Sequence, residues 1–186
     1  LAAATTVQVA GGLANTTLMS STDHYLTGAE IRQAVRTLKR NNARPIGGRF
    51  IAFIHPDTWH DLMGDSNVVN AVQYTANDNL FTGEAPEWMG VRFIETSNAS
   101  VNFSSGQSFA ALYDTIVVGS NAYGTVDLSG ANVDYIYSPP GSAGTSDPLK
   151  TRWTAAWKAL YGCRILSQES IVRIQHVSSY RNGAAV

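Results

Sequence analysis

Four side chains that could bind a metal ion lie within seven residues of one another. His55, Asp57, His60 and Asp61 combine imidazole and carboxylate groups, which are common ligands of zinc and other divalent metals. On a helix, Asp57, His60 and Asp61 would share one face. No second pair of ligands at helical spacing, such as H-E-x-x-H, accompanies them. The simpler interpretation is that Asp57 caps a short helix and the others lie on its solvated side, so we predict no metal site.

Residues 106–110 (GQSFA) approach the G-x-S-x-G motif of serine hydrolases. That motif requires a strand before the serine and a helix after it. Here polar, loop-like residues precede the serine and a strand-like run follows it, so a loop entering a strand is the better interpretation. Neither of the two common phosphate-binding glycine loops is present. We therefore expect no catalytic residue, no cofactor and no enzymatic activity.

The most distinctive polar pattern is a stripe of basic side chains. Residues 27–49 contain six basic side chains and one acidic side chain, although the whole chain has a net charge of −1. At 100° per residue of a helix, one sector about 100° wide contains Arg32, Arg36, Lys39 and Arg40. One interpretation is a solvated helix face. The other is contact with a polyanion, in which cations bind phosphates through counterion release without reading base sequence.

The helix that would carry this stripe has clear limits. Thr27 and Glu30 have the spacing of a capping box, in which a hydroxyl and a carboxylate satisfy the free amides of a helix start. An apolar stripe at helical spacing follows, formed by Ile31, Ala34, Val35 and Leu38. Asn41, Asn42 and Pro45 are expected to end the helix.

The next segments alternate between strands and short helices. Residues 50–54 (FIAFI) are apolar on both faces, which predicts a central strand containing Phe50 and Phe53. Short helices are expected at 57–63 and 66–76, and strands at 91–95, within 109–118 and at 132–137. In the last of these, Val133, Tyr135 and Tyr137 would lie on one side. Residues 138–148 are expected to form an exposed loop.

The C-terminal part is ambiguous in its periodicity. Trp153, Trp157 and Tyr161 fit a strand face, although the same region also fits a helix. The aromatic content and Gly162 favour a long hairpin, with a turn at 168–170 and a second strand at 171–177. A pair such as Trp153 and Trp157 could stack on nucleic-acid bases. Core or interface packing is the interpretation we favour for these aromatic residues and for Phe50 and Phe53. The order of elements predicts an α+β fold.

The composition suggests a surface that other molecules cover. Of the 186 residues, 44% are hydrophobic and only 15% are charged, against about 25% charged in ordinary soluble domains. A secreted β-rich protein is one explanation, and contact with neighbouring subunits is the other.

The single Cys163 excludes an intrachain disulfide and is expected to be a small buried residue. We expect neither a membrane-spanning segment nor a signal peptide. Residues 1–26 contain one charged side chain and are expected to be extended, with weak packing of their own.

Three blocks of the sequence resemble the major capsid proteins of tailed phages, in the family's order. They are LTGAEIRQAVRTLKRNNARPIGGRFIAFIHPDTWHDL, LFTGEAPEWMGVRFIETSNA and DPLKTRWTAAWKALYGCRILSQESIVRIQH. The resemblance is to the branch named after phage N-four and implies an α+β, Hong Kong 97-type phage capsid fold. Lys150 and Trp153 stand where the family tends to have Asn and Gly. The family's N-terminal arm and most of its extended loop have no counterpart, so the chain resembles a C-terminal portion.

The resemblance implies a division of the chain. Residues 1–26 would be the end of the extended loop. Residues 27–56 and 151–186 would form the peripheral domain, with a spine helix at 27–42 and β-strands at 49–54, 153–166 and 171–176. Residues 57–150 would form the axial domain. Segments 1–26, 77–90 and 138–152 would contact neighbouring subunits.

The expected function is that of a structural protein which self-assembles, as hexamers and pentamers, into the icosahedral shell around phage DNA. The partners would be copies of the chain, non-specifically bound double-stranded DNA facing the basic stripe, and decoration proteins. The location would be the virion, with assembly in the host bacterial cytoplasm. Two alternatives are an encapsulin-like nanocompartment shell, which shares this fold, and a metal-dependent hydrolase.

Overall fold

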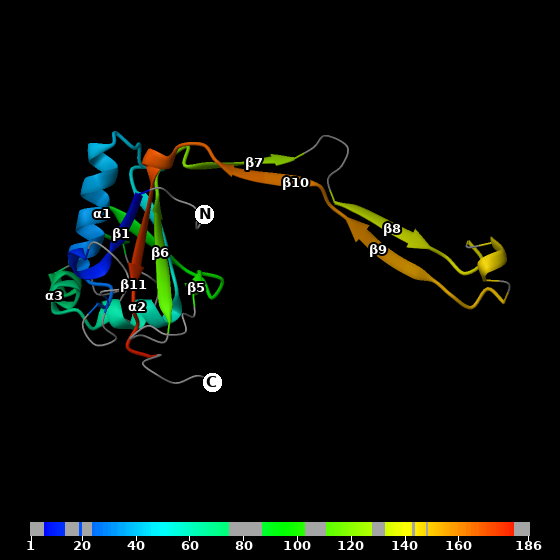
Figure 1. The fold of residues 1–186 in the computed structure, drawn as a ribbon, viewed down its shortest axis with the longest axis horizontal. Helices are drawn as coiled ribbons and strands as arrows, with labels where there is room; N and C mark the ends of the chain where they lie inside the picture. Colours follow the sequence, from blue (N-terminus) through cyan, green and yellow to red (C-terminus); the bar gives the residue numbers. More distant parts are fainter. Residues whose placement is uncertain are drawn as a thin grey trace. The chain divides into compact units, whose positions relative to one another are not determined.

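A computed structural model of the chain describes residues 6–13, 19, 24–74, 87–102, 111–127, 133–142, 144–147 and 149–180. The chain forms two compact units, the first made of residues 1–122 and 165–186 and the second of residues 123–164. We call the first unit the body and the second the ribbon unit, and we describe each by itself (Figure 1).

A mixed sheet forms the centre of the body. Its strands are β1 (Thr6–Val9), β2 (Phe50–Ile54), β3 (Glu87–Trp88), β4 (Val91–Glu95), β5 (Val101–Asn102), β6 (Leu112–Val118) and β11 (Ile171–His176). Their order is β1-β11-β6-β2-β4-β3, and β5 pairs with β6 outside this path. The pairs β1–β11 and β2–β4 are parallel, and the remaining pairs are antiparallel. β2 therefore lies between two strands, which confirms the central strand predicted from its apolar sequence.

The helices of the body cover one face of this sheet. They are α1 (Gly28–Arg40), α2 (Pro56–Met63) and α3 (Ser66–Tyr74), and α1 runs beside β1 and β11 in Figure 1. The main core contains the predicted stripe of α1 together with Leu62 of α2 and Val68 of α3. β2 contributes Phe50, Ala52 and Ile54 to this core. A smaller cluster around Ile116 and Val118 lies on the other side of the sheet, where Phe53 and Ile51 of β2 pack.

The capping box of α1 is confirmed. The backbone amide of Thr27 donates to Oε2 of Glu30 over 2.8 Å, and Oε1 of Glu30 accepts the amide of Gly11 over 2.9 Å. Glu30 is buried, so its carboxylate fixes both the start of the helix and the N-terminal turn η1 (Ala10–Gly12). Gly28 is needed here because a Cβ at this position would lie 2.4 Å from the ring of Trp88.

The expectation of weak packing within residues 1–26 is wrong for the described part. β1 pairs with β11 over four residues. Val9, Ala10 and Met19 are buried in a cluster with Leu112 and Val177. β1 thus forms an edge of the sheet. This pairing could not be predicted from the sequence, because the partner residues of β1 lie more than 150 residues further along the chain.

The ribbon unit contains two pairs of strands and a short turn. Its strands are β7 (Tyr123–Asp127), β8 (Asp134–Ser138), β9 (Thr154–Lys158) and β10 (Tyr161–Ile165), and its turn is η3 (Gly144–Ser146). β8 pairs with β9, and β7 pairs with β10. The predicted hairpin between residues 153–165 and 171–177 is therefore wrong. The expected turn at 168–170 exists as η4 (Gln168–Ser170). It does not connect two paired strands, because β1 and β6, which are distant in sequence, occupy the two edges of β11.

Candidate functional site: a basic helix face and an aromatic ribbon face

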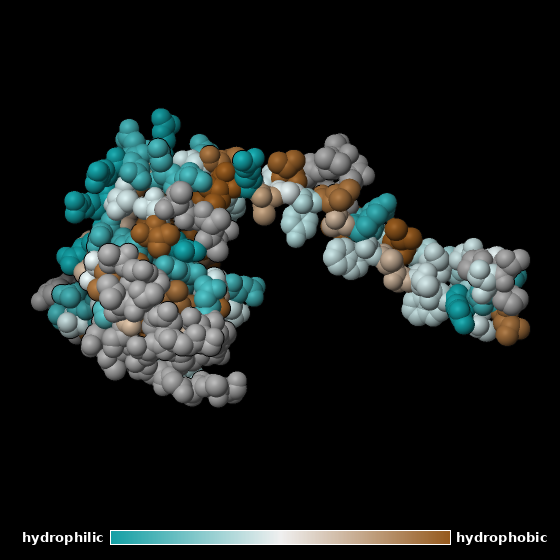
Figure 2. Space-filling model, viewed as in Figure 1, coloured by the Kyte–Doolittle hydropathy of each residue, from teal (hydrophilic) through white to brown (hydrophobic). Residues whose placement is uncertain are grey.

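The basic stripe predicted on α1 lies in solvent. Arg32, Arg36, Lys39 and Arg40 are all exposed, while the apolar stripe of the same helix is buried. None of the four forms an ion pair with a described residue. Figure 2 shows hydrophilic side chains gathered over α1. Four exposed cations on one helix face form a site that can attract a polyanion.

The register of the β8–β9 pair separates two faces. Tyr135 lies opposite Trp157, and Tyr137 lies opposite Ala155. Because strand side chains alternate, these residues share one face. The ring of Trp153 lies 6.2 Å from that of Tyr137, between centroids. We call the surface formed by Tyr135, Tyr137, Trp153 and Trp157 the aromatic face.

The opposite face of the same pair is small and polar. Asp134 lies opposite Lys158, with 3.1 Å between the carboxylate oxygen and Nζ. Ile136 faces Ala156, and Ser138 faces Thr154. The alternation predicted for residues 132–137 is thus confirmed for Tyr135 and Tyr137.

The aromatic face is not a core of the ribbon unit. Tyr135 is 80% exposed, Trp157 70% and Trp153 64%. Tyr161 of β10 is 76% exposed, so these aromatic residues do not form a core within the ribbon unit itself, and their packing against another surface stays a prediction. Cys163 is also exposed, which corrects the expectation that it is buried. The sequence pattern indicated strand faces but not whether another layer covers them.

The predicted positions in β2 are divided between the two faces of the sheet. Phe50 is buried in the main core. Phe53 is partly buried on the other face, where it lines a cavity of about 300 Å³ together with Asp114 and Ile116. The carboxylate of Asp114 is covered and accepts hydrogen bonds from Gln175 and Asn102, and it lies 3.8 Å from Nε of Arg173. Because its partners all belong to the sheet, Asp114 stabilises the fold.

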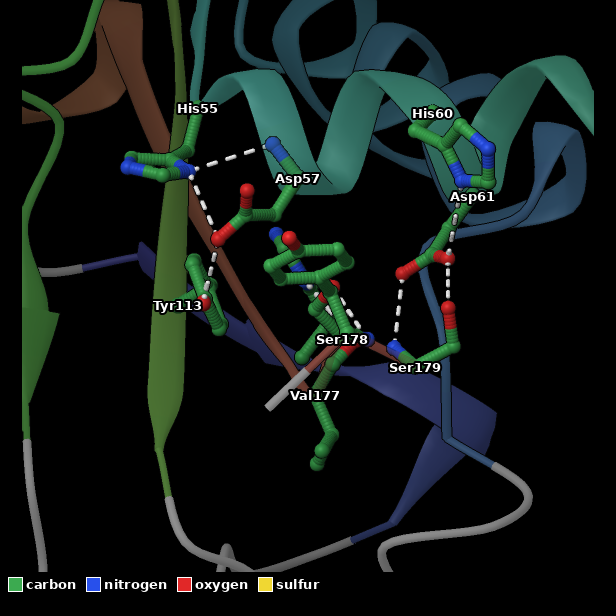
Figure 3. A network of polar contacts seen from close by, with 10 residues as sticks. His55, Asp57, His60, Asp61, Tyr113, Val177, Ser178 and Ser179 are labelled. Atoms are coloured by element: carbon green, nitrogen blue, oxygen red, sulfur yellow. Dashed lines mark hydrogen bonds and ion pairs between the residues drawn. The ribbon is translucent and has the colours of Figure 1, made fainter. Parts of the chain in front are cut away.

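The histidine and carboxylate cluster around α2 forms hydrogen bonds inside the body (Figure 3). Nδ1 of His55 accepts the amide of Asp57 over 3.2 Å, so His55 caps α2. The expectation that Asp57 is the cap is therefore wrong. Asp57 instead accepts the hydroxyl of Tyr113 over 2.8 Å.

Asp61 and His60, the other two members of this cluster, have different surroundings. Asp61 accepts the amide of Ser179 over 2.9 Å as well as its hydroxyl, which ties the C-terminal segment to α2. The side chain of His60 is 85% exposed. Within the described ranges, no group of three His, Cys, Asp or Glu side chains could hold a metal ion. The metal-dependent hydrolase alternative thus lacks a ligand set in this part of the chain. The hydrolase-like residues 106–110 lie outside the described residues.

His176 is a buried residue that the sequence did not single out. Its Nε2 lies 2.8 Å from the hydroxyl of Thr115, and its ring stacks on Tyr113 at 6.2 Å between centroids. Burial lowers the pKa of His176 from 6.5 to about 4, against the opposing effects of the Val177 carbonyl and the charge of Asp61. A histidine kept neutral in this way is a structural group at neutral pH.

Asp147 organises the loop between β8 and β9. Its Oδ2 accepts the amide of Arg152 over 3.0 Å, and its Oδ1 accepts the amide of Thr151 over 3.1 Å. The Arg152 amide, with those of Thr151 and Gly141, holds the pKa of the Asp147 carboxyl below its usual value, although burial acts in the opposite direction. In the described part of the loop predicted at 138–148, Asp147 thus forms defined hydrogen bonds. Asp147 was not singled out from the sequence, although an Asp within a Gly- and Pro-rich stretch is a signal that could have indicated a side-chain-stabilised turn.

No helix in the described part of the chain is long and apolar enough to cross a membrane. No curated protein matches the chain in sequence.

Solved structures of phage shells resemble this chain in fold. The capsid of Ralstonia phage GP4 matches with a TM-score of 0.68 and 14% identity, over 97% of this chain and 55% of that one. The cyanophage Pam1 capsid matches with a TM-score of 0.66 and 16% identity, over 87% of this chain and 48% of that one. The SrpI encapsulin of Synechococcus elongatus matches with a TM-score of 0.57 and 10% identity, over 97% of this chain and 56% of that one.

These similarities confirm the predicted α+β, Hong Kong 97-type fold. The chain spans about half the length of the solved shell proteins that it matches. The sequence profile described as "Phage capsid protein" matches residues 2–117. The chain belongs to the phage capsid protein family.

Proposed function

We propose that this chain is part of a major capsid protein, a structural and non-catalytic subunit that self-assembles into the icosahedral shell enclosing phage DNA. The observation that carries the proposal is the family match over residues 2–117. The exposed aromatic face supports it, because a free subunit would gain nothing from keeping four large rings in water. Hexamers and pentamers in the virion, assembled in the host bacterial cytoplasm, are the form that we propose.

Electron microscopy of the purified particle tests this proposal. The full subunit should form closed shells with local sixfold and fivefold rings, and the particles should contain DNA after infection. Shells that form in cells without phage genes for packaging, and that contain an enzyme, would instead favour the encapsulin-like alternative. That alternative is supported by the fold shared with the SrpI encapsulin. A subunit that never assembles would contradict both.

The finer assignments from the resemblance belong to this proposal as well. They are membership of the branch named after phage N-four, a peripheral domain at 27–56 and 151–186, an axial domain at 57–150, and contacts with decoration proteins. The loop within 138–152 remains a proposed contact between subunits, and its hydrogen-bonded form supports this because a preordered loop loses little entropy on docking. Residues 77–86 of the other proposed contact lie outside the described residues.

We propose that the basic stripe of α1 faces the packaged DNA. Its support is that Arg32, Arg36, Lys39 and Arg40 are exposed and form no ion pair with a described residue. Counterion release predicts that each phosphate contact contributes about 0.9 to the slope of log affinity against log salt concentration.

The test is DNA binding by dissociated subunits over a range of salt concentrations. Replacing all four residues by glutamine should reduce the slope by about 3 to 4 if each contacts a phosphate. Arg92→Gln is the control, because Arg92 is exposed on β4 and lies outside the stripe. An equal slope for the fourfold variant and the wild type would contradict the proposal.

A further inference from the structure

The residues that follow β11 are attached to α2 through a buried carboxylate. Asp61 accepts the amide of Ser179 over 2.9 Å and also its hydroxyl, and the side chain of Asp61 is only 6% exposed. Figure 3 shows Ser179 beside Asp61. Two residues earlier, the amide of Val177 donates to the carbonyl of His24 over 3.0 Å. We call residues 177–180 together with Asp61 the C-terminal clasp.

His176 lies directly before the clasp, at the end of a strand ladder. It is the last residue of β11 and pairs with Tyr113 of β6. After it, an isolated bridge joins Val177 to Tyr25. Separating residues 176–180 from the body would break one pair of the β6 ladder, this bridge and the clasp, and would leave the rest of β11 in place. Such openings at the end of an element cost less free energy than global unfolding.

The ring of His176 is fully buried and has neutral partners. The residue is 0% exposed. Its Nε2 lies 2.8 Å from the hydroxyl of Thr115, and its Nδ1 lies 3.4 Å from the carbonyl of Val177. Because neither partner carries a charge that could compensate an imidazolium, this environment favours the neutral ring.

The charged groups near His176 do not offset its burial. Burial lowers the pKa of His176 to about 4, and the Val177 carbonyl and the charge of Asp61 oppose this shift without cancelling it. The other titratable side chains on the elements packed against β11 are engaged elsewhere or lie on other faces. They are Tyr113 and Asp57, which bond to one another, His55 at the cap of α2, His60 on the exposed side of α2, Glu30 at the start of α1, His24 beside Gly11, and Arg173 on the opposite face of β11.

We propose that protonation of His176 opens the C-terminal clasp, so that residues 176–180 separate from α2 and β6 while the rest of the body stays folded. By this movement the imidazolium reaches water, and few hydrogen bonds are lost. The attachment of the C-terminal residues to α2 is then a switch that acid operates. The inference concerns the body itself and does not depend on the proposed shell function.

The size of the effect follows from the two environments of the ring. In the open clasp His176 has the ordinary pKa of 6.5, and in the closed clasp the pKa is about 4. The closed state is therefore fully favoured above the higher value and loses this advantage as the pH falls toward the lower one. Between about pH 8 and about pH 5, the fraction of molecules with an open clasp should rise roughly 30-fold.

The test is hydrogen–deuterium exchange of the full, dissociated wild-type subunit, read by mass spectrometry with fragmentation to single residues. After correction for the intrinsic pH dependence of exchange, the protection of the Ser179 amide should fall roughly 30-fold between about pH 8 and about pH 5. The amides of β2, which lies between β4 and β6, should keep their protection. Equal falls at Ser179 and in β2 would indicate unfolding of the whole body and overturn the inference. Constant protection of Ser179 would overturn it as well.

Three variants identify the group that responds to acid. His176→Gln should remove the pH dependence at Ser179. His60→Gln is the matched control, because Nδ1 of His60 lies 3.9 Å from Asp61 but its side chain is 85% exposed, and this variant should behave like the wild type. The same pH dependence in both glutamine variants, or its loss in His60→Gln alone, would contradict the proposal.

Asp61→Ala keeps the test decisive if His176→Gln does not fold. It retains His176 but removes the acceptor of both Ser179 hydrogen bonds, so Ser179 should exchange rapidly at both pH values while β2 stays protected. Wild-type protection of Ser179 in this variant would show that Asp61 does not hold the segment, and the inference would fail.

Discussion

Replacing His176 by glutamine should make the body of this protein less sensitive to acid. His176 ends β11 and is fully buried. The carbonyl of Val177, 3.4 Å from Nδ1, can only accept a hydrogen bond, so Nδ1 carries the hydrogen and Nε2 accepts the hydroxyl of Thr115. Protonation would add a charge to a ring with no access to water.

The magnitude follows from the pKa of His176, which burial lowers from 6.5 to about 4. Between these values the unfolded chain binds a proton that the folded chain does not, so the free energy of unfolding falls as the pH falls. Because one pKa unit corresponds to 1.36 kcal/mol, the loss between about pH 7 and about pH 4 is about 3 kcal/mol. Neutral His176 contributes fully to the free energy of unfolding above the pKa of the unfolded chain, 6.5. This contribution is lost as the pH falls toward the pKa of the folded chain, about 4.

The assay is urea unfolding of the dissociated subunit at about pH 7 and about pH 4, with linear extrapolation to zero denaturant. The carboxylates titrate in both proteins, so the difference between wild type and His176→Gln isolates the histidine. The variant should lose about 3 kcal/mol less over this interval than the wild type. His60→Gln is the control, because the side chain of His60 is 85% exposed. An equal loss in wild type and His176→Gln would refute the reasoning, as would an NMR titration of His176 near pH 6.5.

Three further predictions concern single contacts. Gly28→Ala should destabilise the body by about 1–3 kcal/mol in urea unfolding, since the new methyl group would meet Trp88 at 2.4 Å; equal stability would show that the ring moves freely. Thr27→Ala should cost about 1 kcal/mol by removing half of the capping box, whereas Thr27→Ser should retain it. Asp147→Ala should speed amide hydrogen exchange at Thr151 and Arg152, whose amides it accepts; unchanged exchange would contradict its role in the loop.

The elements with local signals were predictable from the sequence. The capping box and the apolar stripe predicted α1, because both depend on residues three or four positions apart. The helix begins one residue after the predicted start at 27 and ends two residues before the predicted end at 42. The continuous apolar run of β2 indicated a strand covered on both faces, and β2 lies between β4 and β6. The exposed position of the basic stripe follows from the same helical periodicity.

Pairings between distant strands were not predictable in this way. The strand pattern at 171–176 was correct, but its partner was assigned to the nearest candidate in the sequence. In the structure β11 pairs with β1 and β6. Side-chain alternation is the same whichever strand lies alongside, so it specifies a face and not a partner.

The chemistry of the histidine cluster was also decided by the tertiary structure. His55, Asp57 and Asp61 looked like potential ligands because they are close in sequence. Tyr113 and Ser179, which bind two of them, come from distant segments. The perturbed residue, His176, carries no local signal, since its pKa depends on burial by the whole sheet.

Residue types at short spacing were sufficient to predict the helix with its basic face and the central strand, and three longer blocks of sequence carried the resemblance to capsid proteins. The pairing of the N-terminal residues with β11 and the exposure of Trp153 and Trp157 could be seen only in the folded chain. Burial is a property of the layers that surround a residue. An aromatic strand face has the same sequence pattern whether its own chain or a neighbouring subunit covers it.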